Sequence, residues 1–255
     1  MADVYVCTSC FNPQTVNLIG QTGLIPLIAA ASAQGIELRE ELSSPVDGGW
    51  KQVGQAIKRS GLNAVYSTPK PLWSEGKKIN TALAGSMVQA GEAAAENIKF
   101  ALGEFQFSAN RLADMRPWLT GVNRAATGIN ITIENDQTVL GGSLKPLKKF
   151  MEFCEFEALP IGLTFDIGNW HWTGEDPVEA AVLLQRFVRY IHIKQVDFCD
   201  GQPRVVPITA EATAQWRQVL RCLPADVPRT IEFPLPDSQS VSELAQYVQM
   251  LRQDI

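Results

Sequence analysis

Short apolar runs and longer stretches of helical periodicity alternate along the whole chain of 255 residues. Each short run is rich in β-branched and aromatic residues, as strands are, and each longer stretch repeats its apolar residues at helical spacing. The pattern predicts eight strands and eight helices in strict alternation. The predicted strands are Val4–Thr8, Ile36–Glu40, Ala64–Ser67, Ile98–Ala101, Ile129–Glu134, Gly162–Asp166, Tyr190–Lys194 and Thr230–Phe233. The predicted helices lie near residues 16–34, 48–60, 80–95, 109–119, 143–158, 177–188, 209–222 and 240–253.

Such alternation predicts parallel strands joined by crossover helices, either in a doubly wound sheet or in a closed barrel. A doubly wound nucleotide-binding sheet usually has a glycine-rich turn after its first strand, and Cys7–Pro13 contains no glycine. Eight units is also the number that closes a barrel. We therefore predict the α/β class and a single-domain (β/α)8 TIM barrel that spans residues 1–255.

The ends of the last four predicted strands share one alternation of polar and apolar residues. Side chains in a strand point alternately to its two faces, so the apolar residues would face the helices and the polar ones the barrel interior. Functional residues of this fold lie at the carboxyl ends of the strands. The polar residues are Thr132 and Glu134, Thr164 and Asp166, His192 and Lys194, and Thr230 and Glu232.

Three carboxylates and an imidazole at one barrel rim predict a divalent metal site. Taken singly, each residue has an ordinary structural role: a helix cap, an ion-pair partner or a hydrogen-bonded core histidine. Together, Glu134, Asp166, His192 and Glu232 would repel one another without a cation, because unpaired buried charges are costly. An oxygen-rich set with one nitrogen favours Mn²⁺ or Mg²⁺, with Co²⁺ or Zn²⁺ as alternatives.

The same segments resemble the xylose isomerase-like TIM barrels, which include sugar phosphate isomerases and epimerases and the AP endonuclease family 2. The spacings of 32, 26 and 40 residues between the four ligand candidates are similar to those of that superfamily. The segments that carry the resemblance are Gly35–Arg39 (GIELR), Ile131–Asn135 (ITIEN), Phe165–Asn169 (FDIGN), Ile191–Lys194 (IHIK) and Ile231–Phe233 (IEF).

This resemblance implies a metal-dependent isomerase or epimerase acting on a sugar or a related polyhydroxy carbonyl compound. Glu134 and Glu232 would then be catalytic as well as ligands, one removing a proton to give an enediolate and the other returning it. Three positions depart from the ketose 3-epimerases. Asn169 stands where they have histidine, Leu140 where they have glutamate and Phe198 where they have arginine.

Three other functions stay open. The first is an inosose-type dehydratase on the same scaffold, and the second is a barrel that binds a metal or a ligand without turnover. The third is the AP-endonuclease branch, whose three-metal cluster uses many histidines. The chain has two histidines and a net charge of -5, which disfavours that branch and nucleic acid as a partner.

Five further residues are candidates for contacts with the small-molecule substrate: Lys194, Asn169, Glu37, Arg39 and Trp170. Lys194 would serve as a cation for an anionic group of the substrate, or pair with a carboxylate of the protein. Glu37 and Arg39 would bind hydroxyls or pair with each other. Asn169 would bind substrate or form a turn, and Trp170 would stack on a sugar ring or pack at the rim.

Cysteine content and hydropathy set the remaining expectations. Five cysteines, an odd and small number, do not suggest a disulfide framework. Reduced thiols in turn predict a cytoplasmic protein. We interpret Cys7 and Cys10 as buried thiols, with a redox pair as the alternative. No apolar stretch is long enough to suggest membrane insertion. A homodimer is a further expectation, since the helix at 143–158 is rich in apolar residues: Phe150, Met151, Phe153 and Phe156.

Overall fold

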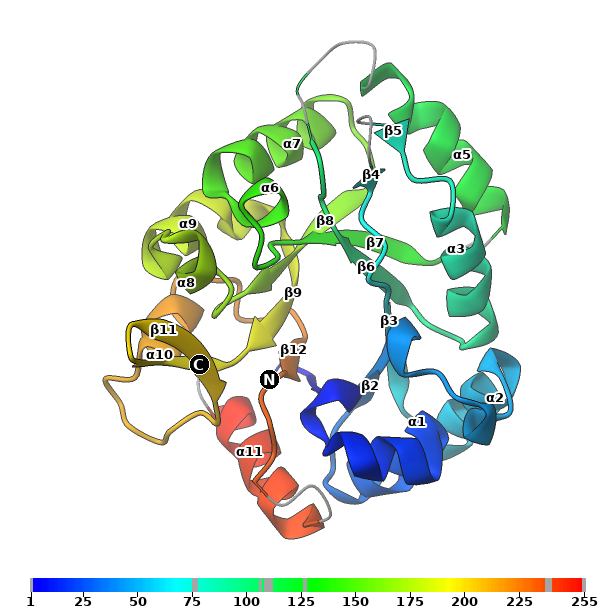
Figure 1. Cartoon of the computed structure of the whole chain (residues 1–255), viewed down its shortest axis with the longest axis vertical. Helices are drawn as coiled ribbons and strands as arrows, with labels where there is room; N and C mark the ends of the chain where they lie inside the picture. The colour runs from blue at the N-terminus through cyan, green and yellow to red at the C-terminus, as the bar shows by residue number, and fades with distance from the viewer. Residues whose placement is uncertain are drawn as a thin grey trace.

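Eight parallel strands close into a barrel, as the alternation along the sequence predicts (Figure 1). The computed structural model describes residues 2–74, 78–105, 107, 112–125, 128–236 and 240–253. Each barrel strand pairs in parallel with its two neighbours, in the order β1-β12-β9-β8-β7-β6-β3-β2. The strands are β1 (Val4–Cys7), β2 (Gly35–Arg39), β3 (Asn63–Ser67), β6 (Asn97–Ala101), β7 (Asn130–Glu134), β8 (Ile161–Asp166), β9 (Val188–Ile193) and β12 (Arg229–Ile231). The predicted (β/α)8 barrel is confirmed.

Helices surround this barrel on its outside (Figure 1). The larger ones cross between successive strands, so that each lays an apolar face on the sheet. They are α1 (Pro13–Ala30), α2 (Trp50–Ser60), α3 (Leu83–Glu92), α5 (Met115–Ala125), α7 (Leu144–Phe156), α9 (Pro177–Leu184), α10 (Gln215–Leu220) and α11 (Val241–Gln253), with the single turns α6 (Val139–Gly142) and α8 (Trp170–Thr173). None of the helices in these described ranges has the length and apolar character needed to cross a membrane.

A small antiparallel sheet of β4 (Trp73–Ser74) and β5 (Lys78–Ile79), which the sequence did not predict, precedes α3. Three further differences concern the predicted elements. An antiparallel hairpin of β10 (Gln195–Cys199) and β11 (Gln202–Val206) follows β9, where the sequence predicted only a connection, and the next helix is correspondingly shorter. The helix predicted at 109–119 starts among residues outside the described ranges, and α5 runs from Met115. The third difference is a break in α1 at Gly20, whose φ is 66°.

The inward and outward alternation predicted for the strands is present in the barrel. Thr164 Oγ1 donates a hydrogen bond of 2.7 Å to Thr132 Oγ1 inside the barrel. The residues between these polar positions, such as Ile133, Phe165 and Ile193, are fully buried in the core between strands and helices. The alternation therefore directs the polar residues of β7, β8, β9 and β12 toward the barrel axis.

The α7 face that suggested a homodimer serves mostly the core of the chain itself. Phe150 and Met151 are buried, and Phe153 packs partly buried against the same core. Phe156 is 85% exposed. The homodimer stays a prediction, now resting on one exposed aromatic residue of the four.

Candidate metal centre

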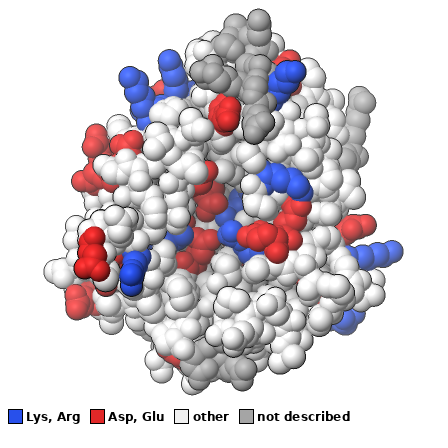
Figure 2. Space-filling model, in the orientation of Figure 1, with Lys and Arg blue, Asp and Glu red and all other residues white. Residues whose placement is uncertain are grey.

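The four predicted ligands meet at the carboxyl-terminal mouth of the barrel. Glu134 and Asp166 are the last residues of β7 and β8, His192 lies near the end of β9, and Glu232 follows β12 directly. Because these strands are parallel, their carboxyl ends open on one face. Figure 2 shows acidic and basic side chains gathered in a hollow at the centre of one face of the molecule.

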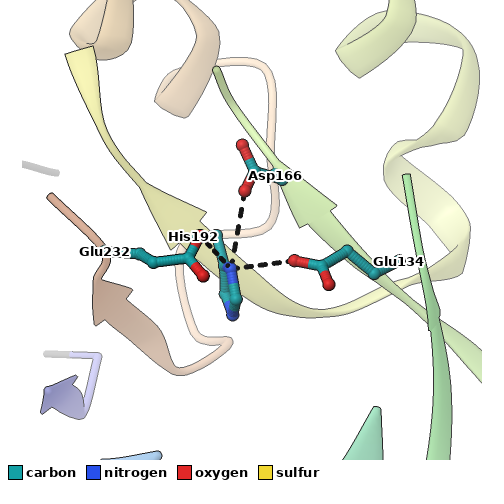
Figure 3. Close-up of side chains that lie close together, drawn as sticks. All are labelled: Glu134, Asp166, His192 and Glu232. Atoms are coloured by element: carbon teal, nitrogen blue, oxygen red, sulfur yellow. Dashed lines mark hydrogen bonds and ion pairs between the residues drawn. The ribbon is translucent and has the colours of Figure 1, made fainter. Parts of the chain in front are cut away.

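One oxygen of each carboxylate points at Nδ1 of His192 (Figure 3). The distances from His192 Nδ1 are 2.8 Å to Glu232 Oε2, 2.9 Å to Glu134 Oε1 and 3.5 Å to Asp166 Oδ2. The four residues each offer a ligand atom within 4.8 Å of the others. This is a compact group of three oxygens and one nitrogen.

The second oxygen of each carboxylate is held by another group of the protein. Lys99 Nζ lies 2.6 Å from Glu134 Oε2, and Arg39 Nη1 lies 3.0 Å from Glu232 Oε1. Asp166 Oδ1 accepts hydrogen bonds from the backbone amides of Gly168 at 2.8 Å and Asn169 at 2.9 Å. Each carboxylate is therefore oriented with one oxygen toward the common centre.

Glu37 holds the far side of the histidine ring. Its Oε2 lies 2.7 Å from His192 Nε2, and both side chains are fully buried. A carboxylate at one ring nitrogen accepts its proton and leaves the lone pair of the other nitrogen free for a metal. This position favours a role for Glu37 in orienting His192 over the substrate contact that the sequence predicted.

Lys99 is a site residue that the sequence analysis did not identify. It lies in the middle of β6 with 1% of its surface exposed, and its Nζ is also 3.4 Å from Glu37 Oε1. The sequence does contain the pattern that predicts an inward-facing Lys99. Ile98 and Phe100 flank it, with the same alternation of apolar and polar residues as in the strands of the four ligand candidates. Lys99 thus connects Glu134 with the carboxylate that holds His192.

Charges within this group are nearly balanced. Four carboxylates (Glu37, Glu134, Asp166 and Glu232) face three permanent cations (Lys99, Lys194 and Arg39), which leaves one negative charge when His192 is neutral. Either a proton on His192 or a bound cation removes that excess. The carboxylates accordingly raise the pKa of His192, against the effect of its burial, which lowers it.

The two candidate catalytic carboxylates are ionised at neutral pH. Burial alone would raise the pKa of Glu134, but the charges of Lys99 and His192 bring it down to about 2. Burial likewise opposes ionisation of Glu232, and His192 and Lys194 lower its pKa well below the usual range. Both side chains can therefore accept a proton or bind a cation.

The donor set suits a divalent ion. Asp166 Oδ2 is buried and faces the common centre, with Lys194 Nζ at 2.7 Å and His192 Nδ1 at 3.5 Å as its neighbours. Cys7, Glu37 and Glu232 form a second, overlapping group. Burial raises the pKa of Cys7 to about 12, so its thiol stays protonated and is a poor ligand beside the carboxylates.

Lys194, Arg39 and Asn169, which the sequence predicted as substrate contacts, lie beside the cluster. Lys194 Nζ is 2.6 Å from Glu232 Oε2 and 3.4 Å from Asn169 Oδ1. Arg39 also pairs with Glu41 at 2.7 Å, between its Nε and Glu41 Oε1. All three therefore have partners within the protein beside the cluster.

Trp170 is fully buried, and its ring centroid lies 5.4 Å from that of Phe165. This favours a packing role over stacking on a bound sugar. His171 lies outside the cluster, with Nε2 2.8 Å from Gln215 Oε1. Leu140 and Phe198, two of the departures from the ketose 3-epimerases, are exposed on α6 and β10.

Comparisons with known proteins give structural likeness only. No protein-family model and no curated protein sequence matches the chain. Solved structures of several enzymes match it over nearly their whole length. A D-allulose 3-epimerase from Methylomonas sp., solved with D-allulose, has a TM-score of 0.69 and 13% identity, covering 100% of this chain and 97% of its own.

Two further structures are similar to the same extent. The probable 3-DHS dehydratase AsbF from Bacillus anthracis has a TM-score of 0.69 and 15% identity, covering 99% of this chain and 100% of its own. The IolI protein, solved with a zinc atom, has a TM-score of 0.70 and 12% identity, covering 99% and 97%. At these identities the likeness concerns the fold, so the chain has the fold of the xylose isomerase-like TIM barrels.

Proposed function

We propose that this chain is a divalent-metal-dependent isomerase or epimerase that acts on a sugar or a related polyhydroxy carbonyl compound. Glu134, Asp166, His192 and Glu232 would hold one ion, Mn²⁺ or Mg²⁺ in preference to Co²⁺ or Zn²⁺. The observation that carries the proposal is the convergence of their four ligand atoms while the outer carboxylate oxygens are held elsewhere. The zinc atom in IolI and the D-allulose in the epimerase support it.

When bound, such an ion supplies a Lewis acid that makes a C–H bond beside a carbonyl more acidic. The chain itself supplies two bases. Glu134 and Glu232 approach His192 from opposite sides (Figure 3), so a substrate carbon between them would have a carboxylate on each face. In an isomerase, one would take the proton and return it to the neighbouring carbon; in an epimerase, the other would first take up a proton from solvent and then deliver it to the opposite face.

Lys194 and Arg39 would position the substrate. Both cations lie against Glu232, Lys194 through Oε2 and Arg39 through Oε1. A substrate hydroxyl or carboxylate at the mouth would find donors there without further rearrangement of the backbone. Asn169 donates from Nδ2 to the carbonyl of Asn135 at 2.8 Å and accepts at Oδ1 from Gln137 Nε2 at 3.2 Å, so a substrate hydroxyl would take the place of Gln137.

A dehydratase on the same scaffold would share the first proton transfer and then need an acid for the departing hydroxyl. Lys194 is the ammonium nearest to both Asp166 and Glu232. Burial lowers the pKa of Lys194, but the two carboxylates raise it by more than burial lowers it. The Lys194 ammonium is therefore a weak acid.

Solvent exchange tests the proposal. The protein with Mn²⁺ is incubated in D₂O with ketoses, sugar acids and inososes, and deuterium at carbon is measured by NMR. We expect metal-dependent exchange with at least one compound, reduced at least about 100-fold in Glu134→Gln and Glu232→Gln, as loss of a general base predicts. Glu152→Gln, an exposed residue of α7, is the matched control.

Three results would contradict this proposal, and each would identify a different function. Exchange accompanied by loss of water would identify the dehydratase. Cleavage of DNA that contains abasic sites would point to the endonuclease branch. Saturable binding of a sugar without exchange at any carbon would leave a binding barrel.

A further inference from the structure

A second cavity opens at the opposite end of the barrel, where the strands begin. Its volume is about 610 Å³, within the range of small-molecule sites. Tyr5, Val65, Asn97, Thr132 and Tyr190 form its deep part. These residues are all buried, and Thr132 and Tyr190 lie two residues before Glu134 and His192 on β7 and β9.

The residues at this level differ from those of an ordinary barrel interior. TIM barrels usually fill their interior with Val, Ile and Leu. Here the inward positions include Gly35, Asn97 and Gly162, which are small or polar. A Cβ at Gly35 would lie 2.5 Å from the Tyr5 ring, and one at Gly162 would lie 2.5 Å from Cγ of Arg189, so these glycines make room for the Tyr5 and Arg189 side chains that line the cavity.

Two buried polar atoms of the cavity lining lack a hydrogen-bond partner among the described residues, Asn97 Oδ1 and the hydroxyl of Tyr190. Asn97 is 7% exposed, and its Nδ2 donates a hydrogen bond of 3.1 Å to Thr132 Oγ1. Its Oδ1 has no hydrogen-bond partner among the described residues. A buried carbonyl oxygen without a donor is costly, so the occupant must carry an N–H or O–H group.

The charged residues at the opening of the cavity favour a cationic occupant over a neutral hydrogen-bond donor. Asp3 and Glu96 are exposed carboxylates at the opening, and Glu96 also accepts a hydrogen bond from the hydroxyl of Tyr5. The only arginine or lysine in the described lining is Arg189, whose Nη1 donates to the carbonyls of Arg186 and Val188. The walls add the rings of Tyr5 and Tyr190, 5.8 Å apart between centroids, which attract cations.

We infer that this cavity binds a small organic ammonium ion, with Asn97 Oδ1 and Glu96 as its acceptors. An aliphatic primary ammonium has three N–H donors and an apolar stem. The donors match the acceptor-rich lining and the net negative rim, and the stem matches Val65 and the faces of the two tyrosines.

Titration with matched probes tests this site. Two-dimensional NMR would follow the backbone amides while n-propylamine hydrochloride, 1-propanol or sodium propionate is added at constant ionic strength and pH 7. We expect saturable shifts around Asn97, Ile131 and Tyr190 with the amine, and affinity at least tenfold weaker for the alcohol and for the carboxylate.

Variants separate the cavity from the rest of the protein. Asn97→Leu removes the acceptor and fills space, and Glu96→Gln removes a rim charge at an exposed position where folding is not at risk. Each should weaken amine binding at least fivefold. Glu92→Gln, which removes an exposed carboxylate of α3 outside the cavity lining, should leave amine binding unchanged. Absence of saturation, equal binding of 1-propanol, or full affinity in Glu96→Gln would overturn the inference.

Discussion

At the scale of single residues, the environment of His192 decides what the mouth of the barrel can bind. Its Nε2 faces Glu37 and its Nδ1 faces three carboxylate oxygens, so one nitrogen is fixed by the protein and the other is directed to the centre. Removal of the carboxylate partner of a metal-binding histidine usually lowers the metal affinity about 10- to 100-fold.

Glu37 should therefore affect metal affinity although it is no ligand. We expect Glu37→Leu to weaken Mn²⁺ binding by roughly 10- to 100-fold, and Glu37→Gln by less, because the amide oxygen still accepts the Nε2–H. Calorimetric titration measures both. Glu41→Gln, which also removes a carboxylate near Arg39, is the control. Equal affinity in Glu37→Leu and the control would contradict this role.

The raised pKa of His192 predicts how the metal-free protein responds to pH. Stability from a raised pKa is complete below the unfolded value of about 6.5 and is lost as pH rises toward the folded value. The melting temperature of chelator-treated protein should therefore fall as the pH rises above about 6.5. His192→Gln should flatten this slope, and His171→Gln, the other histidine, should keep it. A slope unchanged in His192→Gln would contradict the account.

At the scale of elements, regular strands and helices were predictable and the hairpin after β9 was not. The eight barrel strands alternate between apolar residues toward the helices and polar residues inward, and that signal needs no tertiary context. In contrast, Gln195, Asp197 and Phe198 in β10 lie on an exposed two-stranded sheet. Without a buried face, such a strand carries little pattern for the sequence to reveal.

Two helical glycines offer a test of the packing between elements. A Cβ at Gly54 of α2 would lie 2.4 Å from the backbone oxygen of Glu92, at the end of α3, whereas nothing lies within 4 Å of one at Gly85. We expect Gly54→Ala to lower the free energy of unfolding by about 1–3 kcal/mol, since backbone must move. Gly85→Ala should raise it by about 0.4–1 kcal/mol. Urea denaturation measures both, and destabilisation by Gly85→Ala alone would refute this packing.

At the scale of the whole molecule, the barrel brings together residues that are far apart in the chain. Glu37 and His192 are 155 positions apart, and Lys99 and Glu134 are 35 apart, yet each pair is in contact. The fold, the four candidate ligands and their shared rim followed from strand order and alternation. The ion pairs of Lys99, the burial of Trp170 and the cavity at the other end depend on packing across the barrel, which no single strand encodes.

The central claim is that this mouth binds one divalent ion through Glu134, Asp166, His192 and Glu232. The most direct measurement is calorimetric titration of chelator-treated protein with Mn²⁺, repeated for His192→Ala and Glu232→Gln. We predict one site per chain, sharply weakened in both variants, and a gain in stability of about 2.7 kcal/mol at a hundredfold excess over Kd. No binding of Mn²⁺, Mg²⁺, Co²⁺ or Zn²⁺ would contradict the account and leave these residues as an ion-pair network.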